Sequence, residues 1–499
     1  MTTLLLNPSC KKTTGVLFEK YYVRGGSRWP HSGVKIKGTL PHYLPFPFSL
    51  AYAAALLKQK GFDVRIIDAV ALDIGEEEIL KKVARLKPGL VFFECTTPTF
   101  DSDILLASRI KNICPAVVAI AGLHAEEFRF DILRGNQTVD FILRGEYEWT
   151  LLGLAEHLRT GAGLPDGVTY RSGTDAVDSA YPAGVRPLDE LPLPLREAFP
   201  SDVKPQPYVY WDGFCQYRPA LQMQTSRGCR WQCSFCLPAH ITRSSGGYRF
   251  FSAQRVVSEM EILLRHYGAR EIYFDDDNFT AEAGHVRAVC NEIIRRGLCV
   301  RWSCTGDIIG LDEDTLRLMA QSGCIGIKFG LESASPRVLR TIGKPVNPEG
   351  ARLTIRQCRR LKIKTQAAFT IGLLEETASD FEETLGFACS LDLDSLQVSI
   401  ATPFPGTEFY RRAKEKGVLL EAAWERYDGK ISTAIQRHKG YDPLRLKRRF
   451  LLRWMAAKII SPGWIARHVR VIARTVWGAG AIFFLKQVFA VAIDEWKNS

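Results

Sequence analysis

The stretch 221-LQMQTSRGCRWQCSFC-236 joins a strand-like apolar run to a loop that holds three cysteines. These cysteines, Cys229, Cys233 and Cys236, have the spacing C-x3-C-x2-C. Structural zinc sites usually take their ligands as two pairs from separate elements, whereas here all three thiols lie in one loop. An iron–sulfur (4Fe-4S) cluster with one iron left open for another ligand fits this pattern better. A Cys3His zinc site completed by His240 remains the alternative.

The segment that follows this loop alternates between strands and helices. From 219 to 425 we count about six such units, which predict a partial (β/α)6 barrel of the TIM type. In a barrel of this kind the chemistry lies at the carboxyl ends of the strands. Acidic residues stand at two such ends, 275-DDD-277 after one strand and Glu332 with Ser333 after a later one.

The first 160 residues show the same alternation. This pattern predicts a Rossmann-like, doubly wound parallel sheet, in which ligands bind at the carboxyl ends of the strands. Residues 161–218 are rich in Gly, Pro and Asp and predict an extended linker with few regular elements. Residues 426–499 predict a basic and aromatic helical region. The expected fold class is therefore α/β, with a parallel sheet, a partial barrel and a C-terminal helical segment.

The composition of the chain limits the cellular compartments and the classes of binding partner to be expected. The chain has 499 residues, and its start lacks the basic and apolar regions of a signal peptide. We therefore expect a cytoplasmic protein whose 13 cysteines are mostly reduced. The net charge is +12, and residues 437–474 contribute eleven basic residues against one acidic residue, a net of +10. The remainder is nearly neutral, so we expect no nucleic-acid partner.

The cysteine loop, with an aromatic residue just before its third cysteine, resembles that of the radical S-adenosylmethionine (SAM) superfamily. The later segments EIYFDDDNF (271–279), FGLESAS (329–335), FTIGLLEET (369–377) and TPFPGTEFY (402–410) are similar to the branch that carries a cobalamin-binding domain ahead of the barrel. The resemblance covers about residues 1–425. One departure is the loop 372–377, which lacks the Pro and the second Gly of the usual Gly-x-Pro-Gly-Glu-Thr.

The resemblance implies specific roles for residues near the cysteines. The three cysteines would ligate a 4Fe-4S cluster whose open iron binds SAM. SAM would be contacted by Phe235, Asp275, Asp276, Asp277, Glu332 and Ser333. A solvated turn is the alternative for any one of the three aspartates, and an ordinary ion pair is the alternative for Glu332. No residue is assigned as catalytic.

The resemblance also implies cobalamin in the first domain. Its contacts would follow the strand ends and would be Thr96, Thr97, Gly122, His124, Gly145 and Glu146. The motif Asp-x-His-x-x-Gly, whose histidine ligates cobalt in other cobalamin domains, is absent. The domain is then either a cobalamin site without that ligand or an empty relative of one. For His124 we keep two interpretations, a cobalt ligand and a loop histidine beside the corrin.

Two further segments leave alternatives open. Residues 25–52 form a long aromatic and proline-rich stretch that either closes over a substrate or the corrin, or wraps the surface. Residues 443–474 are basic and aromatic, and 475–493 are nearly apolar. This C-terminal region predicts association with a membrane surface, a helical cap on the barrel, or a membrane span.

The expected activity follows from the resemblance. The protein would be a cobalamin-dependent radical SAM enzyme that methylates an unactivated carbon of a small-molecule or lipid-like substrate. A 5′-deoxyadenosyl radical and methylcobalamin would carry this reaction, with electrons from an external donor of the flavodoxin or ferredoxin type. One alternative is a non-methylating radical reaction, such as oxidative cyclisation or rearrangement. Another is a zinc-stabilised binding protein without catalysis. The expected location is the cytoplasm, at the inner face of the membrane if the C-terminus meets lipid.

Overall fold

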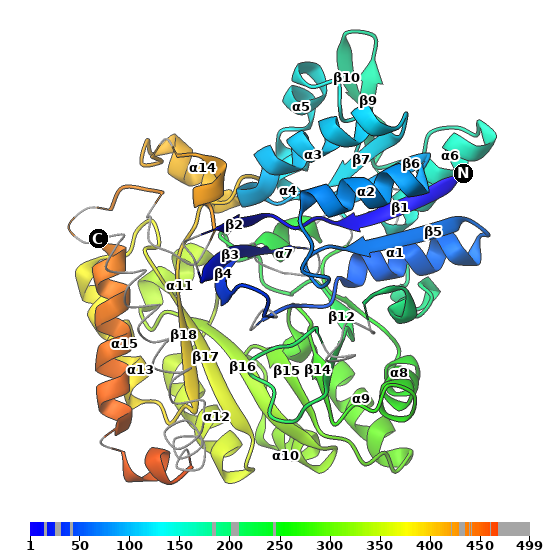
Figure 1. Cartoon of the computed structure of the whole chain (residues 1–499). Helices are drawn as coiled ribbons and strands as arrows, with labels where there is room; N and C mark the ends of the chain where they lie inside the picture. Colours follow the sequence, from blue (N-terminus) through cyan, green and yellow to red (C-terminus); the bar gives the residue numbers. More distant parts are fainter. Residues whose placement is uncertain are drawn as a thin grey trace.

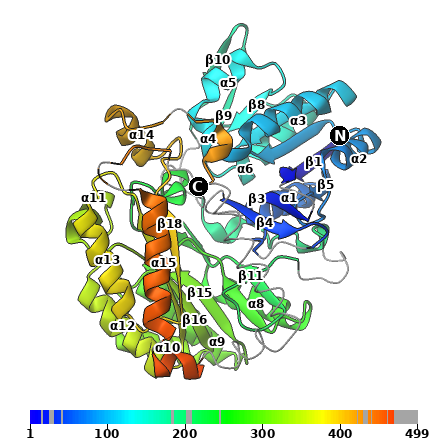
Figure 2. The same ribbon diagram turned by 60° about the vertical axis from the view of Figure 1, so that its left-hand side comes forward.

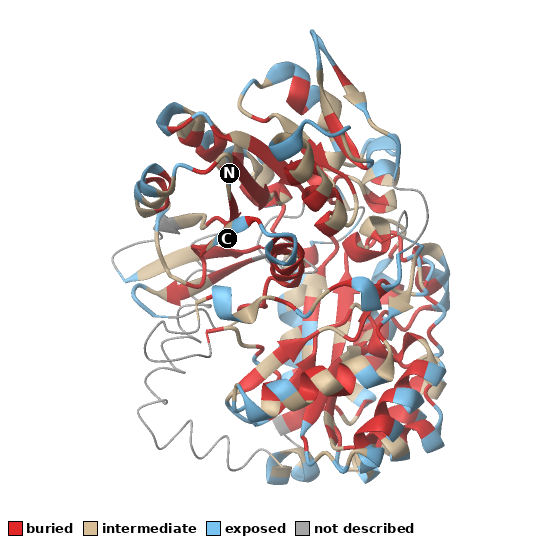
Figure 3. Ribbon diagram, turned by 90° about the vertical axis from the view of Figure 1, so that its right-hand side faces the viewer, coloured by how far each residue is buried: buried red, intermediate tan, exposed pale blue. Residues whose placement is uncertain are grey.

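The structure is a computed structural model with two parallel sheets as its main bodies (Figure 1). It describes residues 1–13, 17–24, 31–39, 43–181, 186–200, 209–242, 246–420, 422–428, 435–438, 440, 442–459 and 461–467. Buried residues are concentrated in the strands of both sheets (Figure 3). The α/β fold class expected from the sequence is confirmed.

The first sheet has the order β10-β9-β8-β7-β6-β1-β5. Its parallel strands are β1 (Thr2–Asn7), β5 (Asp63–Asp68), β6 (Leu90–Glu94), β7 (Val117–Ala121) and β8 (Phe141–Leu143). Its helices are α1 (Phe48–Gln59), α2 (Glu76–Leu86), α3 (Phe100–Ile113), α4 (Leu123–Glu127), α5 (Arg129–Gly135) and α6 (Glu148–Thr160).

Helices cover both faces of this sheet. Strand β1 is a continuous apolar run because Leu5 packs toward α1 and α6, while Leu4 and Leu6 pack toward α2 and α3. The doubly wound parallel sheet expected at the start of the chain is therefore confirmed.

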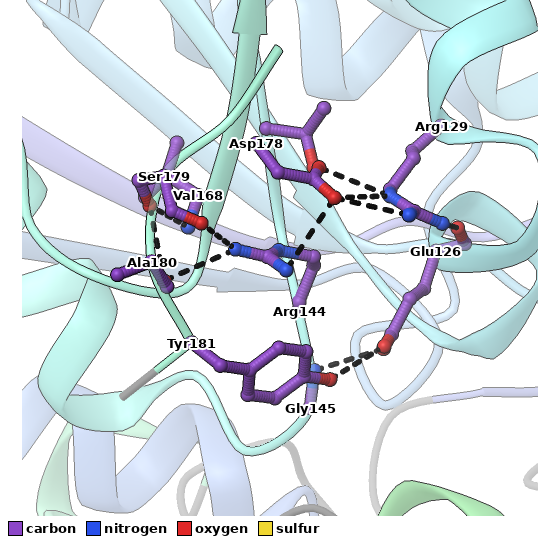
Figure 4. A network of polar contacts seen from close by, with 10 residues as sticks. Glu126, Arg129, Arg144, Gly145, Val168, Asp178, Ser179, Ala180 and Tyr181 are labelled. Atoms are coloured by element: carbon purple, nitrogen blue, oxygen red, sulfur yellow. Dashed lines mark hydrogen bonds and ion pairs between the residues drawn. The ribbon is translucent and has the colours of Figure 1, made fainter. Parts of the chain in front are cut away.

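A hairpin that the sequence did not predict extends this sheet. Strands β9 (Val168–Ser172) and β10 (Asp175–Asp178) lie in the segment expected to be a linker, and β9 pairs antiparallel with β8. Arg129 and Arg144 contact Asp178 at the end of the hairpin (Figure 4). Further along, the described part of this segment contains two short 3-10 turns, Leu188–Glu190 and Arg196–Ala198.

The second large sheet has six parallel strands in chain order. They are β11 (Ala220–Met223), β14 (Glu271–Phe274), β15 (Trp302–Gly306), β16 (Cys324–Glu332), β17 (Lys364–Ile371) and β18 (Ser395–Ile400). The helices between them are α7 (Leu237–Ile241), α8 (Ala253–Arg265), α9 (Ala283–Arg295), α10 (Glu313–Gln321), α11 (Pro336–Ile342), α12 (Pro348–Arg360) and α13 (Ala378–Ser390). This is the partial (β/α)6 barrel that the alternation predicts.

A small antiparallel sheet between β1 and α1 was also not predicted. It consists of β2 (Lys11–Thr13), β3 (Phe18–Val23) and β4 (His31–Ile36) and lies between the two larger sheets in Figures 1 and 2. Asp428, from the C-terminal region, accepts hydrogen bonds from Ser32 Oγ at 2.9 Å and Lys20 Nζ at 3.1 Å. Part of the segment 25–52 thus belongs to a sheet, while Trp29 and His42 lie outside the described residues.

The C-terminal helix α15 (Pro443–Ile459) packs against β18 and α13 (Figure 2). Phe450 is fully buried between the rings of Phe369 and Phe381. This contact supports the interpretation of α15 as a cap on the barrel. In the described part of the chain no helix is long and apolar enough to cross a membrane. The apolar stretch 475–493 lies outside the described residues.

We predict that Phe450→Ala destabilises the barrel by about 3–5 kcal/mol, because it opens a cavity between two buried rings. Urea unfolding followed by tryptophan fluorescence measures this change. Leu452→Ala is the matched control on the same helix, since Leu452 is 65% exposed, and it should cost less than about 0.5 kcal/mol. Equal changes in the free energy of unfolding for the two substitutions would contradict the interpretation of α15 as a cap on the barrel.

Candidate functional site

The carboxyl edges of the two parallel sheets face each other. After β7, the side chain of Leu123 packs on Gly406, which follows β18; a Cβ on Gly406 would lie 2.5 Å from Leu123 Cγ. After β8, Glu148 forms an ion pair with Arg227, which follows β11. Helix α4 also contacts α7 (Leu237–Ile241) of the cysteine loop. Because ligands of both fold types bind at these edges, the two binding regions adjoin.

The cysteine loop is closed at its base by a short antiparallel pair. Strands β12 (Ser226–Arg227) and β13 (Arg249–Phe250) bring the two ends of the loop together. Gly228 has φ +80°, and a Cβ there would lie 2.4 Å from the carbonyl oxygen of Gly247. Only glycine allows this close approach of the two backbones.

Two of the aspartates predicted to contact SAM hold the start of this loop. Asp276 accepts hydrogen bonds from the backbone N–H groups of Thr225, at 2.7 Å, and Ser226, at 3.1 Å. Asp277 accepts one from the N–H of Gly228 at 2.9 Å. Burial raises the pKa of Asp276 to about 6. These hydrogen bonds tie both carboxylates to the loop, and the neighbouring Asp275 is buried.

The three cysteine thiols lie close enough to influence one another. Burial raises the pKa of all three, that of Cys233 to about 12, and the charges of neighbouring cysteines raise the pKa of Cys236 further. Such thiols become thiolates when metal ions take the place of their protons. Asn278 Nδ2 donates a hydrogen bond to Cys229 Sγ at 3.3 Å. This set of donors fits an iron–sulfur cluster.

The geometry does not support the Cys3His zinc alternative. His240 Nε2 accepts a hydrogen bond from the N–H of Glu408 at 3.0 Å, so its Nδ1 carries the proton and donates to the carbonyl of Cys236 at 2.6 Å. Over the described residues, no three His, Cys, Asp or Glu side chains converge closely enough to hold one ion. A four-iron cluster needs wider spacing, because each thiolate binds a different iron.

A buried pair of opposite charges lies at the end of β16. Glu332 has φ +65° at an irregularity of β16, and its carboxylate accepts from Lys344 Nζ at 3.1 Å and Thr370 Oγ1 at 2.6 Å. A Cβ on Gly330 would lie 2.7 Å from both charged groups, so glycine leaves room for the pair. Strained backbone and bulges of this kind cluster at functional sites.

Lys344 is a site residue that the sequence analysis missed. Burial opposes its charge, but Glu332, Cys233 and Asp307 more than offset this and raise its pKa. A buried ammonium group therefore stands near the cysteines. No local pattern marks Lys344, because it follows helix α11 in an ordinary turn and meets its partners only through the fold.

The other two residues predicted to contact SAM differ in their surroundings. The hydroxyl of Ser333 lies 3.0 Å from Thr384 Oγ1 of α13 and accepts from the N–H of Ser335 at 3.1 Å. These contacts place Ser333 on the helix side of the strand end. Phe235 is buried in the large core together with Cys233.

The six residues predicted to contact cobalamin come together at one edge. They follow β6, β7 and β8, which are neighbours in the sheet. Gly122 has φ +112°, and a Cβ there would lie 2.2 Å from the carbonyl oxygen of Cys95, so its glycine is required by the backbone. Thr96 and Thr99 share a hydrogen bond of 2.8 Å. The N–H of Gly145 donates to Glu126 at 2.9 Å (Figure 4).

His124 lies in an aromatic cage. Its ring is 4.4 to 4.9 Å from the ring centroids of Phe100, Phe128 and Trp424, and only 2% of the residue is exposed. Among the described residues its Nδ1 atom has no hydrogen-bond partner, and burial lowers its pKa to about 3. Trp424, another residue that the sequence analysis missed, begins a short 3-10 turn, Trp424–Arg426, well after β18. A buried Nδ1 atom that meets no partner in the described part of the chain, set in an apolar wall, fits a corrin edge.

Two family models match the chain in the expected order. The B12 binding domain matches residues 38–155, and the Radical SAM superfamily matches residues 223–388. The chain is a radical SAM enzyme with a B12-binding domain. A 4Fe-4S cluster, SAM and cobalamin are therefore its cofactors. The cysteine loop provides donors that fit the cluster, and the β6–β8 edge provides surroundings that fit cobalamin.

Curated relatives of this radical SAM protein include several methyltransferases. An uncharacterized methyltransferase of Pyrococcus horikoshii is 28% identical over 88% of this chain and 94% of its own length. The hopanoid C-3 methylase of Methylococcus capsulatus is 24% identical over 88% of this chain and 84% of its own length. Among solved structures, the methyltransferase TsrM of Kitasatospora setae, with cobalamin and cluster bound, has a TM-score of 0.66 at 17% identity, covering 93% of this chain and 89% of its own. This last likeness shows the shared fold.

We predict that Asn278→Leu lowers the reduction potential of the cluster, because it removes a hydrogen bond to the Cys229 sulfur. The expected shift is on the order of 40 mV, the one-electron equivalent of about 1 kcal/mol. A redox titration followed by electron paramagnetic resonance (EPR) measures it. Asn347→Leu, at the start of α12, is the control. An unchanged potential in Asn278→Leu would show that the bond is absent in the loaded protein.

We predict that His124 makes the protein less stable in acid. Its folded-state pKa of about 3 lies below the unfolded value of 6.5, so the unfolded state binds the proton and stability is lost as pH falls below 6.5. The loss is about 2 kcal/mol at about pH 5. His124→Phe should remove this part of the pH dependence in urea titrations at several pH values. His266→Phe, at an exposed position, should keep it.

Proposed function

We propose that this protein transfers a methyl group to an unactivated carbon of a small-molecule or lipid-like substrate. The observation that carries the proposal is the contact between the two carboxyl edges, seen at Leu123 with Gly406 and at Glu148 with Arg227. A substrate held between these edges would meet both cofactor sites at once. When bound, the cluster with SAM would supply hydrogen-atom abstraction, and cobalamin would supply the methyl group.

The chain's own groups would bind and shield these cofactors. The methionine part of SAM carries an ammonium group and a carboxylate, and the pair Glu332 and Lys344 offers one group of each opposite charge. Asn278 would orient Cys229, and the loop 372–377 is closed by Glu376, which accepts from the N–H of Gly372 at 2.5 Å. The departure of this loop from the usual motif is thus accommodated by its own hydrogen bond.

Relatives support methylation but name different substrates. Beside the hopanoid C-3 methylase stands the cytidylyl-2-hydroxyethylphosphonate methyltransferase of Streptomyces wedmorensis, 26% identical over 76% of this chain and 80% of its own length. A lipid-like substrate and a polar small molecule are both represented. The electrons would come from an external donor of the flavodoxin or ferredoxin type.

A second candidate function has its own support. The anaerobic magnesium-protoporphyrin IX monomethyl ester cyclase of Rubrivivax gelatinosus is 27% identical over 80% of this chain and 70% of its own length. An oxidative cyclisation on the same scaffold would use the cluster site without net methyl transfer to product.

Membrane-surface association rests on the outer face of α15. Leu452 and Met455 are exposed there, next to the exposed Arg448. Basic residues with exposed apolar neighbours are typical of helices that lie on anionic lipid. If this face binds lipid, the protein would work at the inner face of the membrane; otherwise the cytoplasm remains the predicted compartment. Flotation with anionic vesicles separates the two outcomes.

The test is anaerobic reconstitution with iron, sulfide, SAM and cobalamin, followed by mass spectrometry of candidate substrates. Methyl transfer predicts a product heavier by one CH2 group and formation of S-adenosylhomocysteine. Formation of 5′-deoxyadenosine with an unmethylated, dehydrogenated product would instead identify the cyclase-type reaction.

We predict that Cys233→Ala abolishes SAM cleavage, because a cluster cannot keep its position with one of three thiolates removed. Iron analysis and the yield of 5′-deoxyadenosine measure the loss. Cys299→Ala is the control, since Cys299 is exposed and lies outside the loop. SAM cleavage that survives in Cys233→Ala would refute the cluster assignment.

A further inference from the structure

Two arginines at the base of the cysteine loop form ion pairs with two glutamates of the first domain. Arg227 and Arg249 face each other across the β12–β13 pair. Arg227 forms ion pairs with Glu148 at 2.6 Å and Glu146 at 3.7 Å, and Arg249 pairs with Glu146 through a short contact. Each arm of the loop is therefore tied to the segment that follows β8.

This ionic cluster is buried. The side chains of Arg227 and Glu148 are 6% and 2% exposed, and the guanidinium of Arg227 also lies 5.1 Å from the ring centroid of Tyr52, from α1. The guanidinium of an arginine keeps its charge in proteins, so loss of the partner carboxylate leaves an uncompensated buried charge.

The cluster continues to the edge where cobalamin is expected. Between the two glutamates, Tyr147 donates a hydrogen bond to Glu94 at the end of β6. Gly145, directly before Glu146, is among the residues predicted to contact cobalamin, and its N–H is held by Glu126 (Figure 4). A ligand that presses on this edge therefore acts on the same short segment, 145–148, that holds the cysteine loop.

Burying charged groups between two domains costs desolvation free energy, and apolar contacts could hold the domains together equally well. The interface already has such contacts, where Leu123 lies with Leu237 and Phe404 in a hydrophobic cluster. The ionic cluster instead fixes direction and distance, because ion pairs and cation–ring contacts are geometrically specific.

We propose that Glu146 and Glu148 are positioning residues that hold the cysteine loop through Arg227 and Arg249, so that cobalamin at the β6–β8 edge changes the environment of the iron–sulfur cluster. This inference rests on the proposed function, since it assumes that both cofactors are present together. It assigns Glu146 a contact with the loop in place of the predicted contact with the corrin.

The test is EPR spectroscopy of the reduced, reconstituted full chain with and without added cobalamin. In the wild-type protein cobalamin should change the cluster signal. In Glu148→Gln and Arg249→Gln the cluster and the bound cobalamin should remain, as shown by iron and cobalt analysis, but the cobalamin-induced change should be lost. Arg249→Lys, which keeps a charge near Glu146, should restore part of it.

Glu259→Gln is the matched control. Glu259 pairs with Arg196 at 3.1 Å, also in a buried contact between the connecting segment and a barrel helix, and among the described residues it forms no ion pair with Arg227 or Arg249. This variant should lose comparable stability and keep the cobalamin-induced change in the EPR signal.

Two results would overturn the inference. One is a wild-type cluster signal that cobalamin does not affect. The other is a full cobalamin-induced change of the EPR signal in Glu148→Gln together with a lowered melting temperature. That combination would show that the Glu148–Arg227 ion pair only stabilises the fold. If Glu148→Gln fails to fold, Arg249→Gln decides, since it leaves the Arg227–Glu148 pair in place. Failure to assemble any cluster in the wild type would instead contradict the proposed function.

Discussion

The carboxylate of Asp276 is bonded to the backbone of Thr225 and Ser226, and the rest of the site depends on this contact. It fixes where the chain leaves β11 and therefore where the cysteine loop begins. The loop then carries Arg227 to the first domain and its thiols to Asn278 and Lys344. A carboxylate buried at this point costs desolvation, and the hydrogen-bond donors of Thr225 and Ser226 offset that cost.

Much of the fold could be predicted because its signals are local. Alternation of strands and helices indicated both parallel sheets, and the spacing of Cys229, Cys233 and Cys236 indicated the cluster. The small sheet β2–β4 and the hairpin β9–β10 escaped because short antiparallel strands in polar, turn-rich sequence carry weak periodicity. Lys344 and Trp424 escaped because each meets its partners only through contacts between distant segments. Asp276 and Glu146 were predicted as contacts of SAM and cobalamin, but spacing alone does not say whether a carboxylate faces a ligand or another part of the chain.

The interface between the domains combines two kinds of contact with different physical consequences. The apolar cluster of Leu237, Phe404 and Tyr427 contributes cohesion and tolerates small shifts, since dispersion forces are not directional. The ion pairs of Arg227 and Arg249 do not tolerate such shifts, because their strength depends on short distances in a medium of low dielectric constant. A molecule that must align two large cofactors across a domain boundary benefits from both.

The helix α15 has a consequence for how the protein is made. It covers β18, the last strand of the barrel, yet it begins only at Pro443, well after β18 ends at Ile400. During synthesis the last strand therefore leaves the ribosome before its cover exists, and its apolar face stays open to other chains for that interval. Chain termination before Phe450 would leave a nearly complete barrel with a permanently exposed edge, so aggregation during expression, rather than loss of chemistry, would be the first sign of a truncated C-terminus.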